Sequence, residues 1–311
     1  MALGTNHMTL TTQAKFIPAM WSDEIIAAYK SNLVLANLVT RINHVGKKGD
    51  TIHIPKITRG AANTKSASTQ VTLNTNTETE VLISINKHYE YSRLIEDIVA
   101  VQALDSMRQI YTDDAGYALS LKVDTDLHTL GATLQGSTAY STAVIGGDGS
   151  TVWNPAANTN TGNGSALADA GIRKMIQTLD DQNVPMEGRA LIVPPVEKKR
   201  LLGITRFTEQ AFVGEVGAAN SIRTGLIGNV YGIPVYVSTN CPTVAATDTT
   251  TNYRVGLMLH KEAFALVEQQ AVRTQTQYKQ EYLGTLFTAD TIYGVGELRD
   301  TSGVAFFVPA L

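Results

Sequence analysis

Hydrophobic positions change their spacing several times along the chain, and each change predicts a different kind of element. Residues 16–39 contain a candidate N-cap at Ser22, after which apolar residues recur at the spacing of a helix. This pattern predicts an amphipathic N-terminal arm, whose apolar face needs a surface to lie on. The apolar positions that define this face are Ile25, Ile26, Tyr29 and Leu33.

The spacing then changes to a period of two, which is the period of a β-strand. Apolar residues alternate over 50–57 and again over 81–92, whereas the residues between them are almost all small and polar. This pattern predicts a long hairpin over 45–92, with a tip at 58–80 that supplies no core positions to its own subunit. Because isolated two-stranded hairpins are only marginally stable in water, the hairpin is expected to dock on another surface.

From residue 93 to residue 131 the helical period returns, which predicts a long helix. Asp105 or Thr112 offers a second N-cap, so either one helix or two helices satisfy the pattern. A helix of about 25 residues is about 40 Å long, which indicates a structural spine. Residues 136–165 are rich in Gly, Ser, Thr and Asn and predict a loop at a segment boundary.

Residues 165–260 alternate between the two periods, starting with a helix at Ser165 and including a short helix that Gly203 ends. Such alternation predicts a compact α+β or α/β domain. The predicted strands are 189–194, 234–239 and 253–259, followed by a long strand at 265–280 with one wet face and a short apolar strand at 305–309.

The glycine-rich stretch 224–240 raises the question of a nucleotide site. Its spacing is G-x-x-G-x-x-x-G before a strand, whereas a dinucleotide fingerprint needs G-x-G-x-x-G before a helix. The stretch is therefore interpreted as a structural turn. Elsewhere, Asp124 and His128 share one face of the predicted helix, which indicates either a weak divalent-ion site or, as the favoured interpretation, a solvated face.

No G-x-S-x-G elbow surrounds any serine, and no catalytic candidate has two independent supports. The single cysteine, Cys241, excludes an intrachain disulfide and a cysteine-based metal site, and the six histidines are scattered. We therefore expect no catalytic residues, no cofactor and no bound metal. No apolar run approaches the length of about 18 residues that a membrane-spanning helix needs.

Composition changes this picture mainly through charge. Residues 1–70 hold eight basic and three acidic side chains, a balance of +5, and the whole chain is at −3, which leaves −8 for the rest. Opposite charges on two parts of one chain indicate that the parts meet, within a subunit or between subunits.

The order of these parts resembles the major capsid proteins of tailed bacteriophages, which share the HK97-like fold. The segments that carry the resemblance are FIPAMWSDEIIAAYKSNLVLANLV (16–39), VGKKGDTIHIPKI (45–57), TGLIGNVYGIPVYVSTN (224–240) and HKEAFALVEQQ (260–270). The resemblance implies an α+β fold with five parts. These are an N-terminal arm at 1–44, an extended loop at 45–92, a spine helix with a peripheral-domain segment at 93–164, an axial domain at 165–260, and a return to the peripheral domain at 261–311.

The resemblance also implies a function. The expected protein is not an enzyme; it self-assembles, as hexamers and pentamers, into an icosahedral phage head that encloses double-stranded DNA without sequence-specific contacts. Further expected partners are a portal, a possible decoration protein and a separate scaffolding protein, because too few residues precede the loop for a fused scaffold. The expected location is the virion, after assembly in the host bacterial cytoplasm. The alternatives are an encapsulin-like shell around a cargo enzyme and a soluble α/β enzyme.

The charge asymmetry predicts where neighbouring subunits touch. The apolar face of the arm and the basic side chains of the hairpin are expected to meet the next subunit, with acidic residues of its spine helix as the counterpart of the basic ones. Besides the arm face, the proposed contact residues are Lys56, Arg59 and Lys65 in the hairpin and Asp113, Asp114, Asp124 and Asp126 in the helix.

Overall fold

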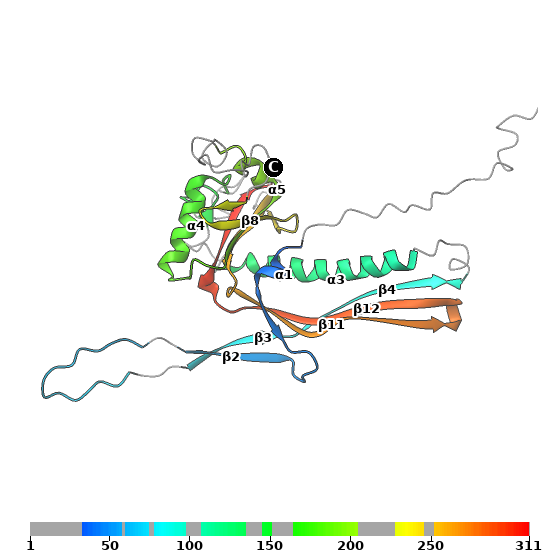
Figure 1. The fold of residues 1–311 in the computed structure, drawn as a ribbon, viewed down its shortest axis with the longest axis horizontal. Helices are drawn as coiled ribbons and strands as arrows, with labels where there is room; N and C mark the ends of the chain where they lie inside the picture. The colour runs from blue at the N-terminus through cyan, green and yellow to red at the C-terminus, as the bar shows by residue number, and fades with distance from the viewer. Residues whose placement is uncertain are drawn as a thin grey trace, which may run out of the picture.

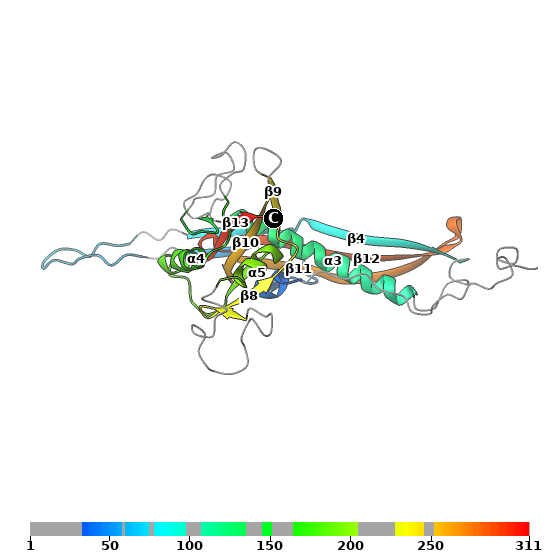
Figure 2. The same ribbon diagram turned by 90° about the horizontal axis from the view of Figure 1, so that it is seen from above.

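A computed structural model describes residues 33–57, 60–74, 78–97, 107–134, 145–150, 164–204, 228–245 and 252–310. Its fold is α+β, as the sequence predicts, with a seven-stranded sheet, a four-stranded sheet and a two-stranded hairpin. The hairpin and the far end of the four-stranded sheet project from the body in opposite directions (Figures 1 and 2). The positions predicted at Ile25, Ile26, Tyr29 and Arg59 lie outside the described residues.

The seven-stranded sheet forms the centre of one unit of the fold. Its strand order is β5 (Ile145–Gly146), β13 (Gly303–Pro309), β10 (Asn252–His260), β6 (Arg189–Val193), β8 (Ile233–Val237) and β7 (Asn229–Val230), and β9 (Thr243–Ala245) pairs with β10. Helices α4 (Asp169–Asp181) and α5 (Pro195–Leu201) pack on one face. The other face packs on α3 (Met107–Gly131) and α1 (Leu35–Leu38). Because both faces are covered, the central strands are continuous apolar runs rather than alternating ones.

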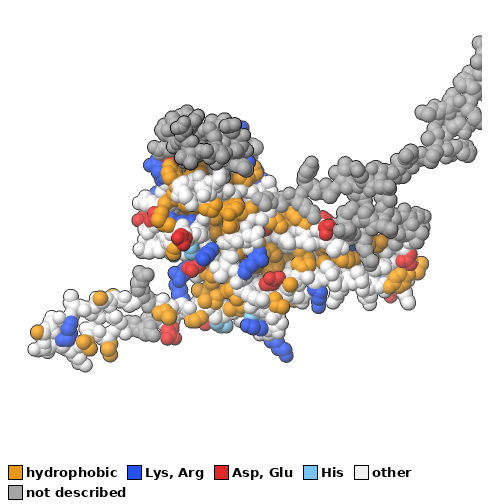
Figure 3. Space-filling model, viewed as in Figure 1, with side chains coloured by type: hydrophobic (Ala, Val, Ile, Leu, Met, Phe, Trp, Pro, Cys, Tyr) orange, Lys and Arg blue, Asp and Glu red, His pale blue; other side chains and the backbone are white. Residues whose placement is uncertain are grey.

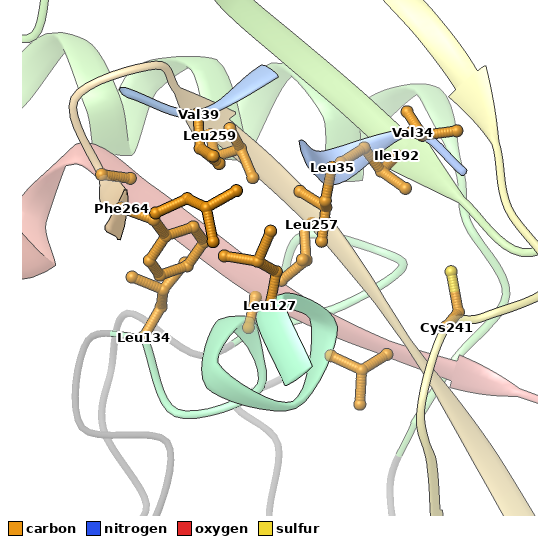
Figure 4. Packing of buried hydrophobic residues seen from close by; sticks show 14 of the residues in the cluster. Val34, Leu35, Val39, Leu127, Leu134, Ile192, Cys241, Leu257, Leu259 and Phe264 are labelled. Atoms are coloured by element: carbon orange, nitrogen blue, oxygen red, sulfur yellow. The ribbon is translucent and has the colours of Figure 1, made fainter. Parts of the chain in front are cut away.

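The core on the α3 side joins three separate parts of the chain. Leu35 of α1, Leu127 of α3 and Leu257 of β10 are fully buried and lie together in one cluster (Figure 4). Phe264, the first residue of β11, closes the same cluster. This contact fixes the spine helix against the seven-stranded unit.

The four-stranded sheet runs outward from this junction. Its order is β1 (Thr40–Asn43), β11 (Phe264–Lys279), β12 (Gly284–Glu297) and β4 (Lys87–Glu96). Helix α3 lies along one face, and the hairpin of β2 (Thr51–Ile57) and β3 (Glu78–Ser84) packs on the other (Figure 1). The alternation of side chains along β11 shows this division, since Phe264 and Leu266 join the α3 side while Ala265 and Val267 contact the hairpin.

Most elements that periodicity predicts are present. The short helix before Gly203 and the five strands predicted after residue 188 are confirmed. The predicted hairpin is present as β2 and β3, but it ends at Ser84 rather than at residue 92, because β4 pairs with β12 in the four-stranded sheet. The described part of the glycine-rich stretch, 228–240, contains the expected turn between β7 and β8, in which Tyr231 and Gly232 adopt φ of 52° and 79°. Positive φ at both central residues is the requirement of a tight two-residue hairpin turn.

Three boundaries differ from the prediction. Residues 93–96 continue β4 instead of starting the helix, because β4 pairs with β12 along its whole length from Lys87 to Glu96. Helix α4 begins at Asp169, four residues after Ser165. The last strand, β13, pairs with β10 and therefore belongs to the seven-stranded sheet, whereas β11 and β12 belong to the four-stranded one.

Candidate assembly surfaces

The tip of the hairpin is the most exposed part of the described chain. Every residue from 60 to 74 is exposed, and Val71 and Leu73 retain 63% and 85% of their accessible surface. The segment nevertheless has internal order: Asn63 Nδ2 donates to Asn74 Oδ1 at 2.8 Å, and Asn74 Nδ2 donates to the carbonyl of Ala61 at 2.7 Å. The tip therefore holds an extended shape through its own hydrogen bonds while it buries no apolar side chain.

The base of the hairpin, in contrast, is anchored. Ile83 and Ile85 are buried against Ala265 and Val267 of β11. Two glycines of β12 make room for this crossing. A Cβ at Gly294 would stand 2.5 Å from the carbonyl oxygen of Ser84, and a Cβ at Gly296 would stand 2.9 Å from Ile83 Cγ1. Glycine is therefore required at the point where β3 crosses β12.

The basic residues predicted to touch a neighbour are exposed where they are described. Lys56 lies at the outer end of β2, and Lys65 lies in the tip, where its Nζ donates to the carbonyl of Ser66 at 2.7 Å. Of their predicted acidic counterparts, Asp113 is exposed on α3. Asp114 is half-buried and accepts a hydrogen bond from the Tyr91 hydroxyl at 2.9 Å.

Asp124 is not a surface charge, which corrects the sequence-based prediction. Its side chain is fully buried, and its Oδ1 accepts hydrogen bonds from the backbone N–H groups of Val34 and Leu35 at 3.1 and 2.9 Å. Its Oδ2 accepts one from Asn240 Nδ2 at 2.8 Å. One carboxylate therefore joins the start of α1, the spine helix and the segment after β8. A signal was present, because Asp124 lies three residues before Leu127, on the same side of the helix.

His128 lies beside Asp124, with Nε2 at 3.5 Å from Asp124 Oδ2, and is itself fully buried. Burial lowers the pKa of His128 to about 4, against a smaller opposing effect of Asp124, so the ring is neutral at pH 7. The predicted solvated helix face is therefore wrong for this pair. Within the described residues, no group of three His, Cys, Asp or Glu side chains is arranged to hold a metal ion.

Asp126 is the second correction. It is buried on the other side of α3, where it lies 3.0 Å from Lys87 Nζ and 3.3 Å from Lys122 Nζ and accepts a hydrogen bond from the Tyr293 hydroxyl at 2.8 Å. Burial would raise the pKa of Asp126, but the hydrogen bonds from Tyr293 and Lys87 outweigh it and lower that pKa. Asp126 thus ties α3 to β4 and β12 within one subunit and is not available to a neighbour.

A groove of about 290 Å³ lies between α1, α3 and the face of the four-stranded sheet that α3 covers. Its floor is formed by Leu119 of α3, Leu266 of β11 and Tyr293 of β12, and its rim includes Leu33 and Val272. Leu33, predicted to contact a neighbour, therefore borders a groove of its own subunit. None of the helices that the structure describes is long and apolar enough to cross a membrane.

These surfaces define a class of protein. A subunit that completes one core by itself, yet holds out an ordered segment with no cover, is a building block of a larger assembly. The sequence matches the family model described as phage capsid protein over residues 77–305, and the chain belongs to that family. No curated protein sequence gives a significant match.

Solved structures agree with this assignment. A chain from Mycobacterium phage Che8 is 25% identical, with 94% of this chain and 97% of that chain covered and a TM-score of 0.71. The capsid of Cyanophage P-SCSP1u gives 18% identity, 98% and 96% coverage, and a TM-score of 0.73. The capsid of Ralstonia phage GP4 gives 13% identity, 95% and 96% coverage, and a TM-score of 0.70. The chain is thus a phage major capsid protein with the HK97-like fold, a subunit of the icosahedral head shell.

Proposed function

We propose that each copy of this capsid protein reaches its neighbour with the extended tip, residues 60–74. The observation that carries the proposal is the exposure of this ordered segment, with Val71 and Leu73 on its surface. Full burial of one such side chain is worth about 1.5–3 kcal/mol, and a shell repeats the contact in every copy. Contacts between two different surfaces of a subunit are also the kind that generates closed rings.

The proposed target is the face of the neighbour's four-stranded sheet that lies opposite α3. The hairpin is packed on that same face of its own subunit. Copies related by the symmetry of a shell turn the same face outward, so a segment on one face meets the same face of the next copy. This reasoning replaces the predicted target on the spine helix, from which Asp124 and Asp126 are excluded by burial.

An acidic candidate lies on the target face. Glu90 of β4 is exposed and stands opposite Asp290 in the strand register, and Asp290 in turn stands opposite Arg273. This row faces away from α3, because the neighbouring residues Tyr91 and Ala289 pack on the helix side. We propose Glu90 as a counterpart of Lys65, with Asp113 kept as the alternative on the helix side.

The wider role follows from the family resemblance. The copies form hexamers and pentamers of a head that encloses double-stranded DNA without reading its sequence. Assembly takes place in the host bacterial cytoplasm with a separate scaffolding protein, a portal and a possible decoration protein. The work of the protein is mechanical rather than catalytic. The hairpin, α3 with the four-stranded sheet, and the seven-stranded unit correspond in this proposal to the extended loop, the peripheral domain and the axial domain.

The test is replacement of residues 60–74 by a short Gly-Ser turn. The variant is expected to keep the circular dichroism spectrum and urea midpoint of the wild-type subunit, because the segment buries nothing of its own, and to form no shells by electron microscopy. A gentler variant, Val71→Ser with Leu73→Ser, should weaken assembly in the same direction. The matched control is Met186→Ser, another exposed apolar residue, in the turn before β6.

Two results would contradict the proposal: normal shells from the shortened variant, or loss of its folded spectrum. Mass spectrometry of the contents of wild-type particles addresses the alternative shell. DNA and portal protein are expected, whereas a cargo enzyme would favour an encapsulin-like function.

A further inference from the structure

The groove between α1, α3 and β11 has an apolar floor that no described residue covers, and its lining also includes the polar residues Asn37, Arg41, Ser120, Glu268 and Thr291. Val272 on its rim is 48% exposed, and Leu33, Ala36 and Val123 are half-buried around it. In the space-filling view, hydrophobic side chains gather over the middle of the body, where α1 and α3 lie (Figure 3). A concave surface with an apolar floor and a few polar groups fits an amphipathic segment that brings an apolar side chain to the floor.

The chain itself enters the described structure at this groove. The first described residue is Leu33, which lines the groove, and 32 residues precede it. The entry point is fixed, because Asp124 holds the N–H groups of Val34 and Leu35. The residues immediately before Leu33 therefore lie near the groove. Tyr29 is four residues from Leu33 in the sequence, and four residues span at most about 14 Å.

The sequence before Leu33 has the face that such a groove needs. Ile26, Tyr29 and Leu33 are spaced at i, i+3 and i+7, which places them on one stripe of a helix. Leu33, the last member of this stripe, already borders the groove. Helix α1 begins only at Leu35, so a helix before Leu33 would be a separate one. Such a helix would place Tyr29 and Ile26 on one side.

We propose that the arm of each subunit, residues 22–32, covers the groove of its own subunit, with Tyr29 lying over Val123 and Val272. The covering segment is favoured in cis, because its attachment at Leu33 gives it a high effective concentration at the groove. The arm then acts as part of the spine of its own subunit, and the tip 60–74 remains the segment that reaches the neighbour. The inference concerns the single subunit and is independent of the proposed loop contact.

Cysteine pairing in the full-length protein tests this placement. Tyr29→Cys is combined with Val272→Cys, and unassembled subunits are treated with a short bis-maleimide linker, which tolerates an error of one residue in register. The native Cys241 is buried, and burial raises the pKa of its thiol to about 12, so it should not react. The control pair, Tyr29→Cys with Met186→Cys, should remain unlinked.

The expected product is an intrachain link at the mass of one subunit. A product at twice that mass would overturn the proposal in favour of an arm exchanged between copies. Absence of any link, with both single variants folded by circular dichroism, would also overturn it.

Limited proteolysis gives a second measurement that needs no cysteine. Trypsin cleavage after Lys30 should be slow in the wild-type subunit and roughly tenfold faster in Val272→Asp, because a charged rim disfavours an apolar cover. Met186→Asp, which changes an exposed residue away from the groove, should leave the rate unchanged. Equal rates in the wild type and in Val272→Asp would contradict the proposal.

Discussion

The seven-stranded unit and the tip of the hairpin are opposite in how they treat apolar side chains. All five residues of β6 are buried, and β13 is buried from Gly303 to Val308. In the tip, every residue from 60 to 74 is exposed although the segment is ordered by hydrogen bonds. The comparison shows that subunit stability resides in one region, while the other supplies surface that only a further chain can bury.

In the four-stranded sheet, a single strand can be buried at one end and exposed at the other. The first four residues of β11 are buried and its outer half is exposed, so the strand passes from the core to the surface. The outer half is held by pairing with β12 and by Asp290, which Arg273 and Gln270 contact. Burial along β11 therefore decreases away from the junction at Leu127.

The largest expected effect is in the seven-stranded unit. Phe306 of β13 is fully buried, and its ring lies so close to Gly256 of β10 that a Cβ there would be 2.1 Å from Phe306 Cζ. Phe306→Ala should lower the free energy of unfolding by about 3–5 kcal/mol through lost burial and a cavity. The measurement is urea unfolding of the unassembled subunit.

Leu73→Ala in the tip is the comparison for Phe306→Ala. Because Leu73 is exposed, this change should shift the free energy of unfolding by no more than about 0.5 kcal/mol. Similar losses for the two variants would show that the tip is part of the subunit core and would remove the distinction between the regions.

The sequence predicts the fully buried strands and the fully exposed tip better than it predicts the four-stranded sheet and α3. A continuous apolar run such as 190–193 predicts a strand that is covered on both faces, and a polar stretch such as 60–74 has no core to join. The tight turn at Gly232 is also predictable from the sequence, because few residues other than glycine adopt its positive φ.

The local sequence pattern does not predict a residue's structure or burial where contacts with distant segments determine it. Leu94 fits a helical stripe in the sequence but belongs to β4, because β12 offers a partner along the whole strand. Asp124 and Asp126 read as surface charges, since an acidic residue on a helix is usually exposed. Their burial depends on groups from distant segments, the N–H groups of α1 and Lys87 of β4. For the same reason, these two carboxylates of the spine helix cannot be the target of the tip.

The next prediction concerns the pH dependence of subunit stability, which depends on the buried His128 of α3. The pKa of His128 is about 4 in the folded subunit, because the ring is buried, and about 6.5 in the unfolded chain. As the pH falls from about 6.5 to about 4, the unfolded chain takes up a proton that the folded state does not, so stability falls by on the order of 1–3 kcal/mol. Below pH 4 this contribution levels off.

His128→Leu should remove that part of the pH dependence. Neither ring nitrogen of His128 has a hydrogen-bond partner, so an apolar replacement should cost little at pH 7. Urea midpoints of the unassembled subunit at pH 7 and pH 4.5 give the comparison. Equal losses in the wild type and in the variant would mean that the ring is already charged, or titrates normally, in the folded state.

The smallest expected effect belongs to the charges of the hairpin. Lys56 and Lys65 are exposed, and each exposed ion pair is worth only about 0–1 kcal/mol. Because a shell repeats the contact in every copy, reversal of both residues to Glu should slow early assembly at low salt. The difference should fade as salt rises, since the Debye length shortens from about 10 Å at 0.1 M to about 3 Å at 1 M. Light scattering across a salt series measures both rates.

A charge exchange identifies the partner surface. If Lys65 meets Glu90 on the open face of the sheet, Lys65→Glu together with Glu90→Lys should restore part of the low-salt rate that either change alone removes. The same exchange with Asp113→Lys serves as the matched control on the helix side. Rescue by Asp113→Lys but not by Glu90→Lys would move the target of the tip back to the spine helix. Identical low-salt rates for the wild type and the Lys56 and Lys65 reversals would mean that the hairpin charges are only solvated, and that burial of Val71 and Leu73 alone drives the contact.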